Sequence, residues 1–182
     1  MTERELAKRI GNGDAEAAEA FVRDHYPAVL RLALRLTNQK EEAEDIAQGT
    51  FLIARQKINT FRGNSTLRTW IHRIAFNEYR QWRRKKRPLA LIDHDLASHD
   101  PGISAFEIGH ILENAMRNLP DKQREAFILF EVEQLSMNEV AHVLGIPTGT
   151  AKARVSYARQ NLRNQLEGRS EVIKDEFQQS TF

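Results

Sequence analysis

The sequence has no cysteine, few prolines and no long hydrophobic run, and each shortage excludes a class of protein. Without cysteine there can be no disulfide, no thiolate metal ligand and no cysteine nucleophile. No apolar segment reaches the roughly 20 residues that a membrane-spanning helix needs, and the polar start is unlike a signal peptide. With 9 glycines and 5 prolines among 182 residues, most of the chain should be regular structure. We therefore expect a cytoplasmic protein with one ordinary domain or two small ones.

The net charge of +2 hides a strongly uneven distribution along the chain. Residues 1–87 carry 18 Lys and Arg against 11 Asp and Glu, whereas residues 88–107 carry four acids and no Lys or Arg. Residues 108–182 are nearly balanced, with 9 basic and 10 acidic side chains. A basic first part and an acidic middle indicate two modules with different tasks, the first of which could bind a polyanion.

Residues 1–87 should be helical throughout. Apolar residues recur at three- and four-residue steps between Ala20 and Leu36, and Asp14 is a good N-cap ahead of them. A second helix is expected from about Lys40 to Ile58, with Gly49 in its middle. A third should run from about Thr66 to Lys86, after the loop 61–65. The predicted apolar stripe of the second helix is Ala43, Ile46, Ala47, Thr50, Phe51 and Ala54, and that of the third is Leu67, Trp70, Ile71, Ile74, Ala75 and Tyr79.

The end of the third helix concentrates positive charge. Six of the eight residues from Arg80 to Arg87 are cationic, and the predicted outer face adds Arg68, Arg73 and Asn77. Such a run can complement the helix dipole, line a solvated face or bind phosphates. The aromatic residues Trp70, Phe76, Tyr79 and Trp82 could stack on bases, although Trp70 and Tyr79 suit the core better. The small polar residues of loop 62–66 could hold an unstacked base.

The second module contains the strongest local motif. Ser136 and Glu139 have the spacing of a capping box, which predicts a short helix from Met137 to Leu144. Gly145 permits a left-handed turn, Ile146 fills the corner and Pro147 starts the next helix, expected from Thr148 to about Leu166. A short capped helix, a glycine turn and a helix with polar first turns form a helix-turn-helix, whose second helix reads the major groove of DNA. The alternative is a plain helical hairpin with a solvated polar face.

Catalytic and metal-binding patterns are weak. The six histidines have no metal-ligand spacing on a shared face, and His94-Asp95 and His99-Asp100 lie in a segment without periodicity. No nucleophile motif is present. We expect no catalytic residue, no metal and no cofactor.

Two blocks of sequence resemble bacterial extracytoplasmic-function sigma factors. Residues 44–52 (EDIAQGTFL) and 61–77 (FRGNSTLRTWIHRIAFN) are similar to region two of that family, and residues 119–127 (LPDKQREAF) and 144–154 (LGIPTGTAKAR) to region four. The resemblance covers nearly the whole chain up to about Leu166.

The resemblance implies an all-α protein with two small helical domains: a region-two domain at 1–87, a flexible acidic linker at 88–104 and a region-four domain at 105–167, followed by a frayed polar tail at 168–182. It also implies a promoter-recognition subunit of RNA polymerase that neither makes nor breaks a covalent bond itself. The implied partners are the clamp coiled coil and the flap of core RNA polymerase, promoter DNA and an anti-sigma factor, with no small-molecule substrate and no membrane insertion.

The resemblance also assigns residues to these partners. Those matching the polymerase contact are Asp45, Gln48, Phe51 and Leu52. Those matching the contact with the melted minus-ten element are Arg62, Asn64, Ser65, Arg73, Asn77, Arg80, Arg83 and Arg84. Those matching the contact with the minus-thirty-five element are Thr148, Thr150, Lys152, Arg154, Ser156 and Arg159. The acidic linker could thread a channel built for nucleic acid.

The chain departs from the family pattern at a few positions. Gly49 stands where the family usually has an acid, and Arg55 where it commonly has tryptophan. Thr148 and Ala151 are smaller than usual, so the base preference does not transfer. Three alternative functions are a sigma-like decoy for an anti-sigma protein, a dimeric helix-turn-helix repressor and an enzyme. A decoy would not need the basic run at residues 80–87 or the donors Thr150, Lys152 and Arg154. A repressor would need a dimer interface, and no extra amphipathic helix is predicted to supply one.

Overall fold

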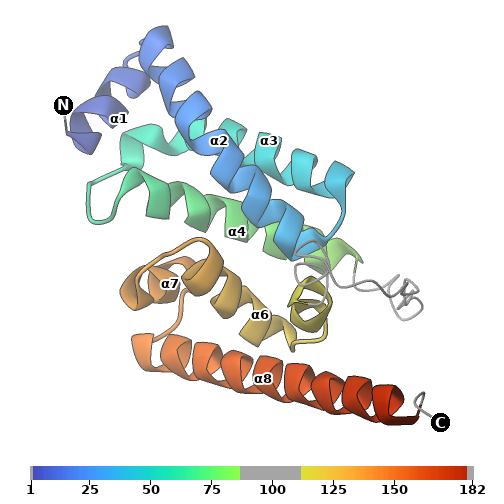
Figure 1. The fold of residues 1–182 in the computed structure, drawn as a ribbon. Helices are drawn as coiled ribbons and strands as arrows, with labels where there is room; N and C mark the ends of the chain where they lie inside the picture. Colours follow the sequence, from blue (N-terminus) through green and yellow to red (C-terminus); the bar gives the residue numbers. More distant parts are fainter. Residues whose placement is uncertain (1, 87–111, 180–182) are drawn as a thin grey trace.

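The computed structural model describes residues 2–86 and 112–179, with side chains described as far as residue 167. Within these ranges all regular structure is helical (Figure 1). The first part contains α1 (Glu3–Gly11), α2 (Ala15–Thr37), α3 (Lys40–Lys57), the 3-10 turn η1 (Ile58–Thr60) and α4 (Leu67–Lys86). The second part has a helical segment at 112–117, then α6 (Asp121–Phe127), the π-helical segment η2 (Ile128–Val132), α7 (Met137–Leu144) and α8 (Thr148–Gln179). The all-α prediction is confirmed.

Helix starts in the first module follow local chemistry. The side chain of Asp14 accepts from the amide of Ala17 at 3.0 Å, which makes it the N-cap of α2 as expected. Thr2 and Glu5 form a capping box at the start of α1. The predicted stripes of α3 and α4 are buried, except that Phe51 and Trp70 are half-buried. The core of the first module therefore lies among α2, α3 and α4.

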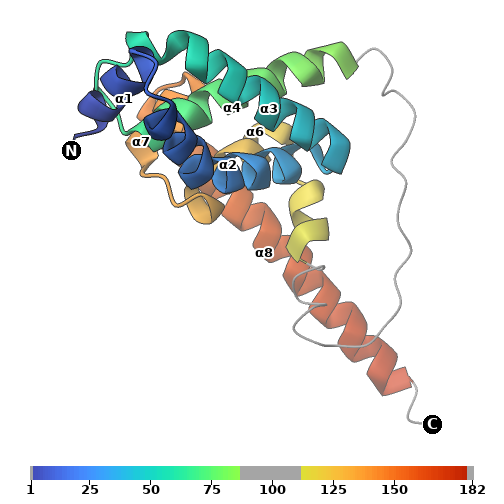
Figure 2. The same cartoon turned by 90° about the horizontal axis from the view of Figure 1, so that it is seen from above.

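The helices stack in layers. Figure 1 shows α1–α4 above, α6 and α7 in the middle and α8 below. Figure 2, which views the molecule from above, shows the C-terminal half of α8 projecting well past the other helices. One hydrophobic cluster of buried side chains includes residues of both modules, from Leu32 and Ile71 to Leu129 and Val140. The two modules thus share a continuous core in this arrangement.

Helix α8 is longer than the sequence analysis expected. It continues past Leu166 to Gln179, through the segment predicted to be a frayed tail. No proline follows Pro147, and residues 169–179 consist largely of residues that tolerate a helix well, so the chain meets no signal that ends it.

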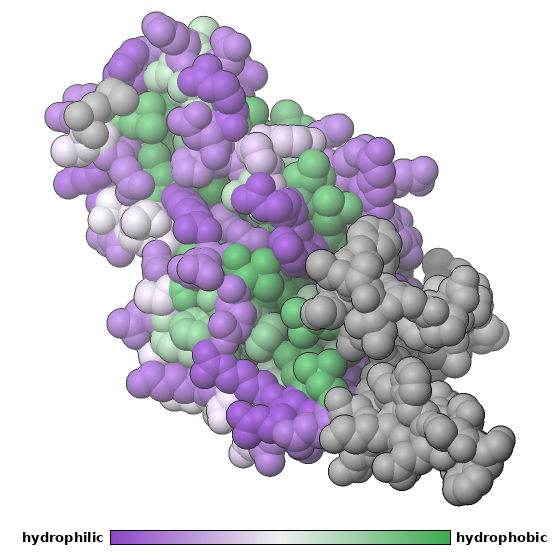
Figure 3. All heavy atoms as spheres, in the orientation of Figure 1, coloured by the Kyte–Doolittle hydropathy of each residue, from purple (hydrophilic) through white to green (hydrophobic). Residues whose placement is uncertain are grey.

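Hydrophilic side chains cover much of the face drawn in Figure 3, and hydrophobic patches show between them. No helix among the described residues is long and apolar enough to cross a membrane. The acidic linker and both of its His-Asp pairs lie outside the described residues.

Candidate nucleic-acid interface

The residues predicted to contact polymerase divide between the surface and the core of α3. Asp45, Gln48 and Leu52 are exposed and follow one another at helical spacing, so they form one stripe. Leu52 is 65% exposed, which is unusual for a leucine. Phe51 turns the other way, with ring centroids 6.0 Å from Phe21 and 5.7 Å from Tyr26 on α2. The stripe can bind a partner, whereas Phe51 holds α3 against α2.

The loop before α4 is fixed by α1. The carboxylate of Glu3 accepts from the amide of Leu67 at 3.0 Å and so caps the first turn of α4. Gly63 has φ of 74°, and a Cβ there would lie 2.8 Å from the side chain of Arg4. The loop therefore needs glycine for both its backbone conformation and its close approach. It presents Arg62 and Asn64 to solvent, with Ser65 half-buried.

The predicted minus-ten residues on α4 fall into two groups. Asn77, Arg80 and Arg84 are exposed and, with Arg83, line a hollow of about 440 Å³ between α3 and α4. Lys57 of α3 lies on the same hollow. The hollow therefore carries four cations, the amides of Asn77 and Gln81, and the carboxylate of Glu78 around one concave surface. Such a surface can hold the phosphates of a single strand.

Arg73 and Arg83 contact the second module, and Arg83 does so in addition to lining the hollow. Arg73 donates to Nε2 of His142 at 3.1 Å. Arg83 donates to Glu125 at 2.6 Å and lies 3.2 Å from Asp121. Burial would lower the pKa of Arg83, but Glu125, Tyr79 and Asp121 together outweigh burial and raise that pKa. Burial raises the pKa of Glu125 despite the neighbouring guanidinium.

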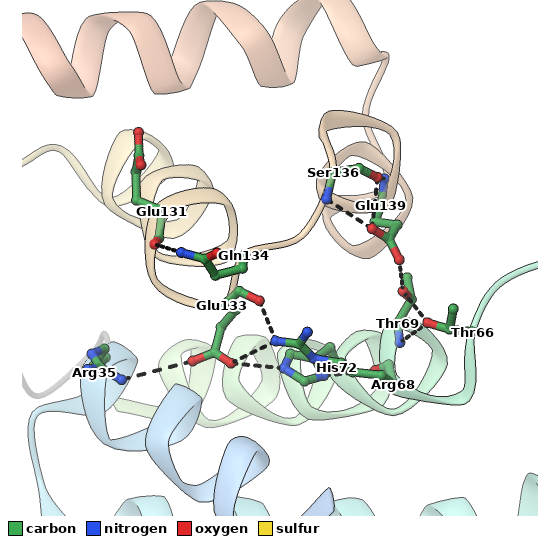
Figure 4. A network of polar contacts seen from close by, with 10 residues as sticks. All are labelled: Arg35, Thr66, Arg68, Thr69, His72, Glu131, Glu133, Gln134, Ser136 and Glu139. Carbon is green, nitrogen blue, oxygen red and sulfur yellow. Dashed lines mark hydrogen bonds and ion pairs between the residues drawn. The ribbon is translucent and has the colours of Figure 1, made fainter.

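A buried polar network joins the middle of α4 to η2 (Figure 4). The Nε2 atom of His72 lies 3.2 Å from the carboxylate of Glu133, and both side chains are almost fully buried, at 0% and 3% exposure. The Nδ1 atom of His72 faces the carbonyl of Arg68 at 2.8 Å. Because a carbonyl can only accept, Nδ1 of His72 is the donor in its bond to Arg68.

Further groups complete this network. Arg68 donates to the backbone carbonyl of Glu133, and both Arg35 and Arg68 lie 3.9 Å from its carboxylate. Gln134 follows in the left-handed region with φ of 56°, which is uncommon for a residue other than glycine. This turn ends η2 and leaves both the carbonyl and the carboxylate of Glu133 directed toward α4 (Figure 4).

Glu139 links the capping box of α7 to the start of α4. One carboxylate oxygen accepts from the amide of Ser136 at 2.9 Å and from its hydroxyl at 2.8 Å. The other accepts from the hydroxyl of Thr69, which also lies 2.8 Å from that of Thr66 (Figure 4). Burial would raise the pKa of Glu139, but the bonds from Thr69 and Ser136 lower it overall.

The helix-turn-helix has the predicted form. Helix α7 spans Met137–Leu144, both halves of the Ser136–Glu139 capping box are present, and Gly145 adopts a left-handed φ of 68°. The predicted inner residues of α8 are buried: Ala151, Val155, Ala158 and Leu162. The local signals therefore determine this unit.

The predicted minus-thirty-five residues occupy two sides of α8. Helical spacing places Thr148, Lys152, Ser156 and Arg159 on one side, and Thr150 and Arg154 on the other, with Gly149 and Ala153 between them. The hydroxyl of Thr148 donates to Asn138 at 3.2 Å, and Arg159 donates to Glu131 at 2.7 Å. The small residues in the middle allow the helix backbone to come close to a groove floor.

Sequence reasoning missed three residues. His72 and Glu133 were assigned no role, because their pairing joins positions 61 residues apart and has no local pattern. Tyr157, 57% exposed, lies on the same side of α8 as Thr150 and Arg154, and its three-residue step from Arg154 could have revealed it.

Phe76 was predicted as a possible stacking surface, but it is 2% exposed in the shared core and cannot stack on a base. Trp82 is half-buried and donates to Glu42 at 2.6 Å.

Among the described residues no group of three or more His, Asp or Glu side chains could hold a metal ion.

Comparison with known protein families gives two matches along the chain. The family described as Sigma-70 region 2 matches residues 21–88, and Sigma-70, region 4 matches residues 109–162. The first covers most of α2 and all of α3 and α4, and the second includes the helix-turn-helix.

Curated proteins that align with more than nine-tenths of this chain are also sigma factors. The chain is 30% identical to the ECF RNA polymerase sigma factor SigW of Bacillus subtilis, over 91% of this chain and 97% of that protein. It is 27% identical to the ECF RNA polymerase sigma-E factor of Haemophilus influenzae, over 92% and 96%. Among solved structures, the sigma factor RpoE bound to the anti-sigma factor NepR from Bartonella quintana is similar with a TM-score of 0.69. It is 29% identical over 82% of this chain and 96% of that chain.

Proposed function

The chain belongs to the extracytoplasmic-function sigma factors, and from that premise we propose how its surfaces divide the work of promoter recognition. As a sigma factor it directs core RNA polymerase to promoters and assists strand opening. The observation that carries the proposal is that one chain presents two separate polar, cationic surfaces, one around α4 and one on α8.

Polymerase docking is assigned to the α3 stripe. Asp45, Gln48 and Leu52 share one exposed face, and Arg55 extends it by a further helical step. An exposed leucine between polar side chains suits an interface with an apolar centre and a polar rim. Phe51 supports this face from behind.

Holding the melted minus-ten strand is assigned to the loop and to α4. Arg62 and Asn64 are exposed beside the start of α4, and the hollow lined by Asn77, Arg80 and Arg84 continues along the same helix. Unstacking a base costs a few kcal/mol, which a fixed loop and a cationic wall can offset. Because Glu3 caps α4, the loop is already in place when DNA arrives.

Reading the minus-thirty-five element is assigned to α8. Lys152 and Ser156 are exposed on one side and Thr150 on the other, so both sides can reach base edges or phosphates when the helix enters a major groove. We place the two working domains at residues 1–87 and 105–167, joined by the linker 88–104.

Control by an anti-sigma protein follows from the same premise. The similar RpoE structure is a complex with an anti-sigma factor. In this chain a hollow of about 550 Å³ lies between α2 and the second module, with apolar side chains among four arginines. The arginines are Arg31, Arg35, Arg117 and Arg124, and the side chains of Glu113 and Glu131 also line the hollow. An amphipathic segment with acidic flanks fits this lining.

The decisive experiment mixes the purified chain with bacterial core polymerase and a library of genomic fragments. We expect initiation from a small set of fragments that share two elements. Initiation equal to that of core enzyme alone would refute the proposal. Association with an anti-sigma protein in the absence of any initiation would favour the decoy.

A further inference from the structure

We propose that Glu78 of α4 belongs to the polymerase-docking surface and supplies it with a carboxylate through the gap that Gly49 leaves in α3. This inference rests on the proposed function, because it extends the α3 stripe assigned to core polymerase. It adds a residue of a second helix to that surface and names the kind of side chain that this residue binds.

Gly49 interrupts the row of side chains on the exposed face of α3. Asp45 precedes it by four residues and Leu52 follows it by three, and both are exposed. Side chains at these spacings are neighbours on a helix, with their Cβ atoms about 5–6 Å apart. A side chain at position 49 would therefore lie next to both of them, and glycine provides none.

The carboxylate of Glu78 occupies this gap. A Cβ at position 49 would lie 3.3 Å from Oε2 of Glu78, so the carboxylate rests against the α3 backbone. Helices α3 and α4 pack against each other, which allows a side chain of α4 to reach this place. Glycine is a poor helix former, and here it leaves room for a side chain from the neighbouring helix.

One oxygen of this carboxylate is held within the chain and the other can accept from a partner. The side-chain amide of Gln81 donates to Oε1 at 2.9 Å. Within residues 2–86 and 112–167, Oε2 has neither a hydrogen-bond donor nor a cation at ion-pair distance. The Glu78 side chain is half-buried, so its position is restricted while solvent can still reach it.

The charge of this surface indicates a basic partner group. Glu78 and Asp45 bring two carboxylates to the exposed Leu52. Arginine suits such a site, because its planar guanidinium donates to carboxylates and is more weakly hydrated than an ammonium group. We therefore assign to the polymerase surface a basic side chain that faces Glu78, beside an apolar patch that faces Leu52.

Glu78 also borders the cationic hollow on α4, together with Arg80 and Arg84. A carboxylate repels a phosphate, so Glu78 does not help this hollow to hold a DNA strand. Its place at the rim marks the boundary between two surfaces. The cations of α4 lie on the side assigned to DNA, and the carboxylate lies on the side of the α3 stripe.

The test measures binding of the full chain to bacterial core polymerase by fluorescence titration. Glu78→Gln keeps the size of the side chain and removes its charge. The matched control is Glu19→Gln, which removes an exposed carboxylate from α2 in the same module. A relocation variant combines Glu78→Ala with Gly49→Glu, so that the carboxylate is lost from α4 and returned from α3. Its reference is Glu78→Ala alone.

We expect Glu78→Gln to raise the dissociation constant about fivefold to tenfold at low salt, between the effects typical of an exposed ion pair and of a charged hydrogen bond. The difference from the wild type should shrink as salt is added, because ions screen an exposed charge. The melting temperature should not change, since no ion pair among the described residues is lost. The control should bind like the wild type, and the relocation variant should recover most of the affinity that Glu78→Ala loses.

Wild-type polymerase affinity in Glu78→Gln would overturn the inference, and so would a relocation variant as weak as Glu78→Ala. Tighter binding of Glu78→Gln to a fluorescent oligothymidylate, with unchanged polymerase affinity, would assign the carboxylate to the DNA surface and overturn it as well. The proposed function fails separately, if the wild-type chain does not bind core polymerase. Binding that Leu52→Ala weakens and Glu78→Gln leaves unchanged refutes the role of Glu78 alone.

Discussion

Leu52 and Phe51 are neighbours in sequence, yet their replacement should affect different properties. In Leu52→Ala we expect weaker binding to core polymerase with an unchanged melting temperature. The side chain is 65% exposed, so the free chain gains little from it. Burying the lost methine and two methyl groups completely would be worth about 2 kcal/mol, and the 65% exposed share of that is about 1.3 kcal/mol. The dissociation constant should therefore rise roughly tenfold.

Phe51→Ala should instead destabilise the first module. Its ring packs against Phe21 and Tyr26, and removing a half-buried aromatic side chain should cost about 2–3 kcal/mol. For a chain of this size that is a drop of roughly 5–10 °C in melting temperature. Below the melting transition, its polymerase binding should change less than that of Leu52→Ala.

The assay compares both variants by calorimetry and by titration with fluorescently labelled core polymerase. Gln56→Ala is the control, since Gln56 is exposed and lies four positions after Leu52. It shows how far any substitution on this part of α3 changes polymerase binding. If Leu52→Ala lowers the melting temperature while binding polymerase normally, the assignment of the stripe is refuted.

Three further perturbations test other parts of the structure. Gly49→Ala should stabilise the chain by about 0.5–1 kcal/mol in chemical denaturation, because alanine favours the helix more than glycine does. The added Cβ would lie 3.3 Å from the carboxylate end of the Glu78 side chain, which can move away. A loss of stability would show that the Glu78 side chain cannot move. The bond from Lys86 lowers the pKa of Glu42, so its stabilising contribution is present above the ordinary value of 4.5 and is lost as pH falls below it. Glu42→Gln should therefore flatten the melting temperature between pH 6 and about pH 3, and an unchanged slope would contradict the pairing. Lys152→Ala should weaken binding to the upstream element by about 1–3 kcal/mol in fluorescence anisotropy if it reads a base, whereas equal loss on unrelated duplexes would indicate a phosphate contact.

The sequence could predict those features whose causes are local. The helix-turn-helix follows from Ser136, Glu139 and Gly145, each of which acts within a few residues of its own position. The start of α2 follows from Asp14 in the same way. The stripe on α3 was predictable in part: the family resemblance named its residues, but only the packing of α2 separates Phe51 from Leu52.

The contact between modules could not be predicted, because its partners are far apart in sequence. Helix α4 was expected to have one buried face and one solvated face. It has a second buried face because Glu133 covers His72, and neither residue belongs to a periodic apolar pattern. The cations of α4 looked equivalent in sequence, yet Arg83 pairs with Glu125 while Arg80 and Arg84 are exposed.

The surfaces assigned to polymerase and to the upstream duplex are exposed in the same arrangement of the two modules. The α3 stripe is exposed, and so are Lys152 and Ser156 of α8. Under the proposed function, core polymerase can therefore bind the chain without a prior rearrangement. Any later change in this arrangement would be driven only by a difference in the affinity of polymerase and DNA for the two states, since a ligand shifts an equilibrium only by its differential affinity.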